Sequence, residues 1–213
     1  MRTPAEALFA LLLRRRAPIL AAALMVSACA GAGTTRPARV EVTQDARGFT
    51  IAEKVRVSAG ARADFERAVR SLAQGKYESG IATLLKVTGA APTSTSAHID
   101  LAIAYGRVGA VERAEASIKR ALELNPRHPV AHNELGILYR KKGRFQEARK
   151  SYEKALALYP EFHFARRNLA ILCDLYLSDV DCALEQYERY THAVPEDEEA
   201  GRWLADLRTR KAR

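Results

Sequence analysis

The stretch PVAHNELGILYRKKGRFQEARKSYEKALALYP, residues 129–160, decides the fold because it is one copy of a pattern that recurs every 34 residues. Two sets of residues share that spacing, one of glycines and one of prolines: Gly75, Gly109 and Gly143; Pro92, Pro126 and Pro160. A fixed period of this length is typical of a helical repeat array, whose unit is a helix-turn-helix.

Small residues recur in the same register and predict where two helices approach closely. They form two columns: Ala68, Ala102, Gly136 and Ala170; Gly80, Ala114 and Ala148. Small side chains let helix backbones come together, and the glycine set falls where the chain must turn between helices. The period alone therefore predicts an all-α fold.

The quoted stretch resembles the tetratricopeptide repeat (TPR) almost position for position. The residues in the signature places are Leu135, Gly136, Tyr139, Ala148, Tyr152, Ala155 and Pro160. This resemblance implies a TPR superhelix of about four helix-turn-helix repeats over residues 61–194 and a C-terminal capping helix over 196–213. The individual repeats are expected at 61–94, 95–128, 129–162 and 163–195.

The two outer repeats depart from the pattern. In the first, Arg67 and Ser71 stand where leucine and tyrosine are expected, so this repeat is degenerate. The fourth has one extra residue in its turn, and Cys173 replaces the usual tyrosine. Terminal repeats are commonly atypical, so the spacing still predicts a helix pair at each place.

The register also predicts the helix bounds. Nine helices are expected, at 62–74, 77–87, 96–108, 111–124, 130–142, 145–158, 164–177, 182–193 and 196–211. The last begins with acidic residues and ends with basic ones, which suits the helix dipole. Its Trp203, Leu204 and Leu207 are expected on one side, closing the end of the array.

The amino end carries a second signal. Three arginines at 14–16 precede an apolar run at 17–26 and then V-S-A-C at 26–29. This pattern predicts a signal peptide over 1–28, too short to span a bilayer. V-S-A-C resembles a bacterial lipobox, which implies that Cys29 is acylated and starts the mature chain. The alternative is ordinary cleavage after Ala30.

The lipobox resemblance also implies a place in the cell. Acyl chains on Cys29 would make the lipid bilayer one partner, because two or more chains hold a protein on a membrane stably. Ala30 follows the cysteine where an aspartate would retain the protein in the inner membrane. We therefore expect an outer-membrane lipoprotein facing the periplasm. Residues 29–60 are expected to be a lipid-anchored linker, with a possible short β-strip at 39–57.

Charge and motifs exclude several functions. Without residues 1–28 the chain has 30 basic and 24 acidic side chains, a net charge of about +6. This either favours anionic partners or is an ordinary solvated helical surface. No basic run interleaved with aromatics indicates nucleic acid. The sequence also lacks a phosphate loop, a nucleophile elbow and H-E-x-x-H. We expect no enzyme and no cofactor.

His128 and His132 are four residues apart, but His128 lies before Pro129 in an expected turn. They are therefore interpreted as surface histidines, and no metal site is predicted. Cys173 and Cys182 are expected to face each other across a turn, which is compatible with a disulfide in an oxidising compartment. The alternative is two buried free thiols.

In TPR arrays the first helix of each pair lines a concave groove, mainly through positions 2, 5, 9, 12 and 13. Those positions here give Phe65, Val69 and Leu72; Ile99, Ile103 and Arg107; Asn133, Ile137, Arg140 and Lys141; Phe164, Arg167 and Ile171. The resemblance thus implies an apolar ladder with a basic edge, suited to an extended or helical peptide with aliphatic anchors and some acidic groups. It does not reproduce the lysine and asparagine clamp of the cytosolic chaperone adaptors. Alternatively, the linker fills the groove, or some of these residues are core.

The expected function is a non-enzymatic adaptor that binds and positions an envelope protein or peptide partner at the outer membrane. Four alternatives remain: a pilotin-like assembly factor for a type IV pilus secretin, an accessory component of an energised transport system, a scaffold for peptidoglycan hydrolases, and a structural oligomeric spacer. A wall-cleaving enzyme would need clustered polar side chains in a pocket, where the register places aliphatic ones.

Overall fold

The computed structural model describes residues 40–45, 48–53 and 57–212, with side chains from residue 57 onward. The chain divides into two units, Met1–Thr35 and Arg36–Arg213, and all described residues lie in the second. The expected signal peptide and Cys29 therefore lie outside the described residues. Strands β1 (Val40–Asp45) and β2 (Gly48–Glu53) form an antiparallel hairpin in the segment expected to be a linker.

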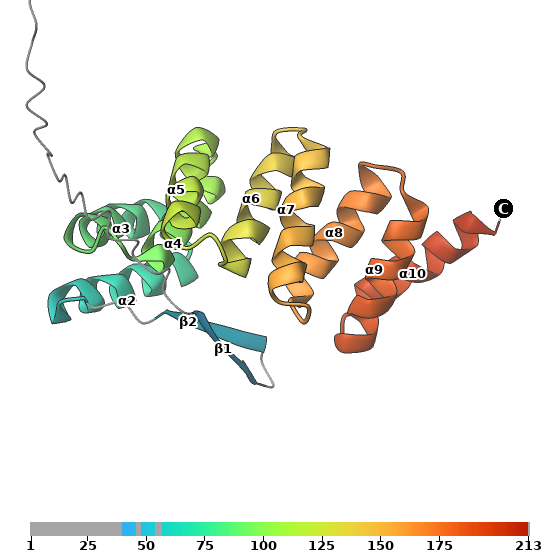
Figure 1. Cartoon of the computed structure of the whole chain (residues 1–213), viewed down its shortest axis with the longest axis horizontal. Coiled ribbons are helices and arrows are strands. Elements are labelled where there is room, and N and C mark those ends of the chain that lie inside the picture. The colour runs from blue at the N-terminus through green and yellow to red at the C-terminus, as the bar shows by residue number, and fades with distance from the viewer. Residues whose placement is uncertain (1–39, 46–47, 54–56, 213) are drawn as a thin grey trace, which may run out of the picture. The chain divides into compact units, whose positions relative to one another are not determined.

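The rest of the described chain is helical, which confirms the predicted fold class. The helices are α2 (Ala59–Ala73), α3 (Tyr77–Ala90), α4 (Thr95–Arg107), α5 (Val111–Leu124), α6 (Pro129–Lys141), α7 (Phe145–Leu158), α8 (His163–Leu175), α9 (Val180–Ala193) and α10 (Glu198–Lys211). They stack in chain order as antiparallel pairs (Figure 1). The bounds of α5 and α7 match the expected ranges.

In the third repeat, a small residue on one helix makes room for a large residue on the other. Gly136 of α6 faces Tyr152 of α7, which is fully buried. A methyl group added to Gly136 would lie 2.5 Å from Cε1 of Tyr152, closer than carbon atoms approach. Ala102 and Ala170, at the same register position, are likewise buried. The small-residue column is therefore the contact line inside the repeats.

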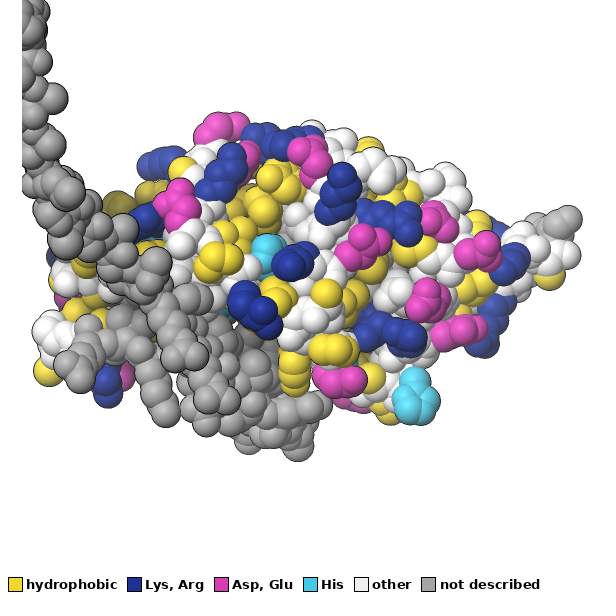
Figure 2. Space-filling model, in the orientation of Figure 1, with side chains coloured by type: hydrophobic (Ala, Val, Ile, Leu, Met, Phe, Trp, Pro, Cys, Tyr) yellow, Lys and Arg dark blue, Asp and Glu magenta, His cyan; other side chains and the backbone are white. Residues whose placement is uncertain are grey.

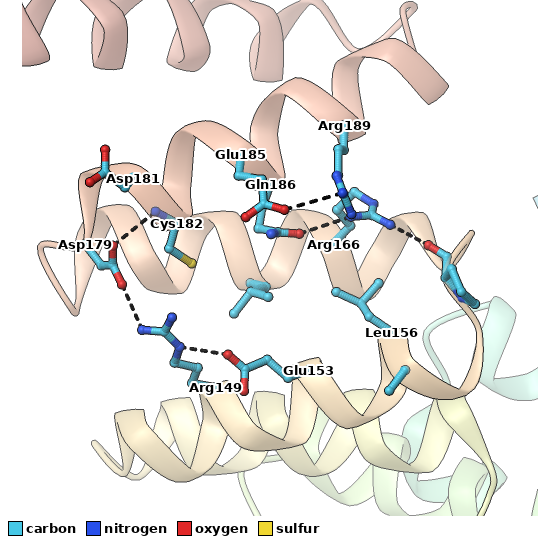
Figure 3. A pocket seen from close by; sticks show the side chains of 13 residues that line it. Arg149, Glu153, Leu156, Arg166, Asp179, Asp181, Cys182, Glu185, Gln186 and Arg189 are labelled. Atoms are coloured by element: carbon cyan, nitrogen blue, oxygen red, sulfur yellow. Dashed lines mark hydrogen bonds and ion pairs between the residues drawn. The ribbon is translucent and has the colours of Figure 1, made fainter.

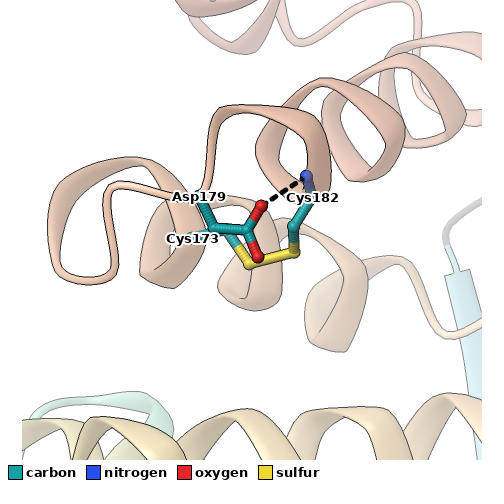
Figure 4. A group of neighbouring side chains, drawn as sticks. All are labelled: Cys173, Asp179 and Cys182. Carbon is teal, nitrogen blue, oxygen red and sulfur yellow. Dashed lines mark hydrogen bonds between the residues drawn. A yellow bond between two sulfur atoms is a disulfide. The ribbon is translucent and has the colours of Figure 1, made fainter.

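The turns inside the first three repeats use the glycine set. Gly75, Gly109 and Gly143 have φ angles of 73°, 78° and 71°, a left-handed conformation that glycine adopts without a Cβ penalty. In the fourth repeat, with its extra residue, Ser178 takes this conformation at φ 53°. There Cys173 and Cys182 form a disulfide with a Cα–Cα distance of 5.9 Å (Figure 4). It links the end of α8 to the start of α9.

Successive repeats are joined by a hydrogen bond that also follows the period. The ring nitrogen Nε2 of His98 lies 3.2 Å from the carbonyl oxygen of Pro92, and that of His132 lies 2.9 Å from that of Pro126. Arg166, at the same register position, donates to the Pro160 carbonyl at 2.5 Å. Each bond ties a first helix to the end of the preceding repeat.

Helix α10 closes the array as expected. Leu204 and Leu207 are buried against α9, and the Trp203 ring lies 6.0 Å from that of Tyr187. The Asp197 carboxylate accepts the Ala200 N–H at 3.1 Å and so begins the helix two residues later than predicted. Among the helices of residues 57–212, none has the length and apolar character to cross a membrane.

Candidate partner-binding hollow on the first-helix face

The first helices of the pairs, α4, α6 and α8, contact one another and form a surface that we call the first-helix face. Between α4 and α6 this face has a hollow of ≈ 410 Å³, the α4–α6 hollow. Its lining is Ala102, Ile103, Gly106, Arg107, Glu134, Ile137, Leu138, Arg140 and Lys141.

The α4–α6 hollow brings five of the expected groove residues together. Ile103 and Ile137 occupy the same register position on neighbouring helices and give it an apolar part. Arg107, Arg140 and Lys141 come from the last turns of the two helices and give it a cationic part. An apolar patch beside cations suits a peptide that carries both an aliphatic and an acidic side chain.

Other expected groove residues lie elsewhere. Ile99 and Asn133 are buried, each 3% exposed, so they belong to the core beneath the surface. Phe65, Leu72 and Ile171 are half-buried against the core. Val69 on α2 and Phe164 on α8 are exposed, at 40% and 64%, away from the lining of the hollow.

Arg167 is held by the capping helix. Its Nε lies 3.3 Å from the Asp197 carboxylate, and its guanidinium carbon lies 5.0 Å from the centre of the Trp203 ring. Because these contacts use the charge of Arg167, this residue braces α8 against α10. It contributes no free cation to the first-helix face.

Glu134 is a lining residue that the sequence analysis missed. Burial raises the pKa of Glu134 to about 7, and burial also raises the pKa of Asp100, at the equivalent position of α4, to about 6. The 34-residue period does carry the signal, in one polar column: Glu66, Asp100, Glu134 and Asn168. This column was missed because it is not one of the five groove positions taken from the family.

The cations of the hollow are not engaged in salt bridges within residues 57–212. Arg107, Arg140 and Lys141 form no salt bridge with any described residue. Lys141 Nζ donates to the Gly106 carbonyl at 3.0 Å, and the Arg140 guanidinium lies 5.8 Å from the centre of the Tyr176 ring. Both contacts hold a cation in place and leave its charge available to a ligand.

A second cleft, of ≈ 650 Å³, lies between α7 and α9 (Figure 3). Two of its three cations are paired with acids: Arg149 contacts Glu153 and Asp179, each at 2.8 Å, and Arg189 lies 3.6 Å from Glu185. The third, Arg166, donates to Gln186 Oε1 and to the Pro160 carbonyl oxygen. Over the face drawn in Figure 2, basic and acidic side chains are likewise interspersed. The α4–α6 hollow differs from this cleft because none of its three cations forms a salt bridge with a described residue.

His128 and the cysteines of the fourth repeat serve structure. His128 is buried, and its Nδ1 accepts the Ala131 N–H at 3.4 Å, so the interpretation of His128 as a surface residue is wrong. Burial and the nearby His132 lower the pKa of His128 to about 4. In residues 57–212, one group has the spacing of metal ligands, namely Cys173, Asp179 and Cys182, but its two sulfur atoms are joined in the disulfide.

Comparison with known proteins finds a repeat family and solved structures that resemble this chain. Residues 99–161 match the family described as Tetratricopeptide repeat. A thermophilic TPR protein of Thermus thermophilus is 25% identical, with a TM-score of 0.62 over 69% of this chain and 80% of its own. Residues 99–161 therefore match the tetratricopeptide repeat, and the helical array shares the fold of a solved TPR protein.

Two further solved structures share the fold. PilF of Pseudomonas aeruginosa is 23% identical, with a TM-score of 0.66 over 71% of this chain and 69% of its own. The first TPR of Spaghetti (RPAP3), solved with the HSP90 peptide SRMEEVD, is 26% identical, with a TM-score of 0.52 over 57% of this chain and 97% of its own. No curated protein sequence matches this chain.

Proposed function

We propose that this chain is a lipid-anchored adaptor that binds a segment of an envelope protein in the α4–α6 hollow. The observation that carries the proposal is the pair Ile103 and Ile137 beside three cations that form no salt bridge with a described residue. Apolar contacts would supply affinity, and the charges would select an acidic segment. The SRMEEVD peptide of the RPAP3 complex, with both apolar and acidic residues, supports this kind of ligand.

The anchor in this proposal is Cys29, acylated after removal of residues 1–28. Its support is the lipobox-like V-S-A-C alone. In this arrangement the acyl chains keep the array at the periplasmic face of the outer membrane, and the linker sets how far the hollow reaches. Replacing the cysteine in Cys29→Ser should release the protein from the membrane fraction, whereas an unchanged location and unchanged processing would refute the anchor.

The test of the adaptor is in-cell crosslinking of a carboxyl-terminally tagged protein, followed by affinity capture and mass spectrometry. The variant Ile103→Lys/Ile137→Lys places two charges on the apolar part of the hollow and should lose the captured partner. A matched control, Arg149→Lys/Arg189→Lys, keeps the charges of the α7–α9 cleft and should retain it.

The outcomes separate an adaptor from a spacer. Loss of one enriched envelope protein from the hollow variant alone supports the adaptor and identifies its client. An identical capture profile for all three proteins contradicts it. Circular dichroism of the hollow variant must match that of the unmodified chain, because both isoleucines are half-buried and their replacement must not unfold α4 or α6.

A further inference from the structure

The charges lining the α4–α6 hollow do not cancel. Three cations, Arg107, Arg140 and Lys141, line it together with one carboxyl group, that of Glu134. The single hydrogen bond found for this carboxyl among the described residues comes from Asn133 Nδ2, at 3.0 Å to Oε1. The other carboxylate oxygen has no such bond, so it remains available to a ligand.

Groups from α4, α6, α7 and α8 lie around Glu134. Helix α4 contributes Asp100 and Arg107, and α6 contributes Lys141, whose charges all act on the Glu134 carboxyl. Helix α7 contributes the buried hydroxyl of Tyr152. Helix α8 contributes a neutral group, the Asn168 amide, which donates to Asn133 Oδ1 at 3.0 Å. Burial and the Asp100 carboxyl favour the protonated form of Glu134, against the pull of the two cations.

We propose that the α4–α6 hollow binds a carboxylate of an extended, acidic partner segment, and that Glu134 takes up one proton as this carboxylate enters. The proposal rests on the proposed function, because it specifies the ligand of the same hollow. The proton comes from solvent and stays on Glu134 while the segment is bound.

Repulsion between the Glu134 carboxylate and the incoming carboxylate explains why Glu134 takes up a proton. Two ionised carboxyl groups brought into one hollow would repel each other, whereas a neutral Glu134 can donate a hydrogen bond to the incoming carboxylate. Arg107, Arg140 and Lys141 then face a single negative charge. A basic segment is disfavoured, since it would meet three cations and only one acid.

Proton uptake makes binding depend on pH in a defined direction. In the free protein the pKa of Glu134 is about 7, so the group is mostly protonated at pH 6 and mostly ionised at pH 8. If the bound form requires the proton, affinity should fall about tenfold from pH 6 to pH 8. A glutamine in place of Glu134 mimics the neutral acid at every pH and should bind equally at both.

The experiment uses an array of random 12-residue peptides without histidine, probed at pH 6 and pH 8 with the unlipidated mature chain, expressed from residue 30. Four proteins are compared: the unmodified chain, Glu134→Gln, Asp100→Asn and Ile103→Lys/Ile137→Lys. Asp100→Asn is the matched control, because it removes the neighbouring buried acid and leaves Glu134 in place.

The unmodified chain is expected to select acidic peptides with aliphatic residues. The unmodified chain and Asp100→Asn should bind these peptides about tenfold more weakly at pH 8 than at pH 6. Glu134→Gln should bind them equally at both pH values. Selection of basic peptides, or equal binding of acidic ones at both pH values, overturns this inference and leaves the adaptor standing. If no peptide binds, or if Ile103→Lys/Ile137→Lys binds the same set, the proposed function itself fails.

Discussion

The third repeat (α6 and α7) and the fourth (α8 and α9) each bury a large tyrosine and a small residue in the core, but they secure the packing differently. The third has Gly136 against Tyr152 and turns at Gly143. The fourth has Ala170 at the small position, turns at Ser178, and carries a disulfide across the turn. The interior repeat gains its stability from close packing between two neighbours, whereas the last repeat uses a covalent link and a capping helix.

The largest effect should come from breaking the packing of the third repeat. Gly136→Val places a branched side chain where even a methyl group would lie 2.5 Å from Tyr152, so we expect a loss of about 3 kcal/mol in the free energy of unfolding. Urea denaturation followed by circular dichroism measures it. The control is Gly106→Ala, whose added methyl group meets only Leu138 Cδ2, at 3.9 Å, and should leave stability equal or higher.

The next effect should come from removing the covalent link of the fourth repeat. Cys173→Ala/Cys182→Ala opens a loop of sequence separation 9, which should cost about 2 kcal/mol. Hydrogen exchange should show the loss mainly in α8, α9 and α10. If α4 to α7 lose as much protection as α8 to α10, the disulfide does not stabilise the fourth repeat independently of the third. The unmodified chain should fall to similar stability in a dithiol reductant.

A smaller effect, dependent on pH, should distinguish the two repeats at one register position, where the third has Glu134 and the fourth has Asn168. Because burial raises the pKa of Glu134 to about 7, the folded state binds its proton more tightly than the unfolded chain does. Stability from this group is therefore full below about pH 4.5 and is lost as the pH rises through 7. Glu134→Gln should therefore be more stable than the unmodified chain at pH 8, and this difference should disappear as the pH falls to about 4.5. A constant difference across this range would contradict the assignment.

The smallest effect should come from making the fourth turn resemble the third. Ser178→Gly removes a Cβ from a left-handed conformation, but glycine also gains freedom in the unfolded chain. We expect a gain of about 0.5 kcal/mol, measured by urea denaturation. Gly143→Ser makes the reverse change and should lose about 1 kcal/mol. If both substitutions raise the free energy of unfolding, or both lower it, the two turns are not equivalent.

The helices were predictable because a repeated spacing reports on backbone geometry, which is local and recurs. Five of the nine residues that line the α4–α6 hollow followed from the same register. The burial of Ile99 and Asn133 did not, since the period fixes which helix face a residue is on and not how deep it lies. The engagement of Arg167 by α10 also escaped prediction, because it joins residues 30 apart through two side chains that do not repeat.

The raised pKa of Glu134 is a second property that the repeat pattern did not predict. Glu134 and Asp100 were visible as a column in the sequence, but an acidic residue on a helix is usually solvated. Only the packing of α4 beside α6 buries them and raises their pKa values. Charge type can therefore be predicted from a repeat, whereas the protonation state depends on neighbours that belong to other repeats.

The hydrogen bonds from His98 and His132 to Pro92 and Pro126 have a consequence for the length of the array. The partners are six residues apart and the whole pattern recurs every 34 residues, so excision of one period restores the same bond at the junction. Deleting residues 99–132 would join the start of α4 to the body of α6 in a single helix and would keep Pro92 opposite His98. The array can thus lengthen or shorten by whole units, as gene duplication and loss require, without leaving an unmatched end.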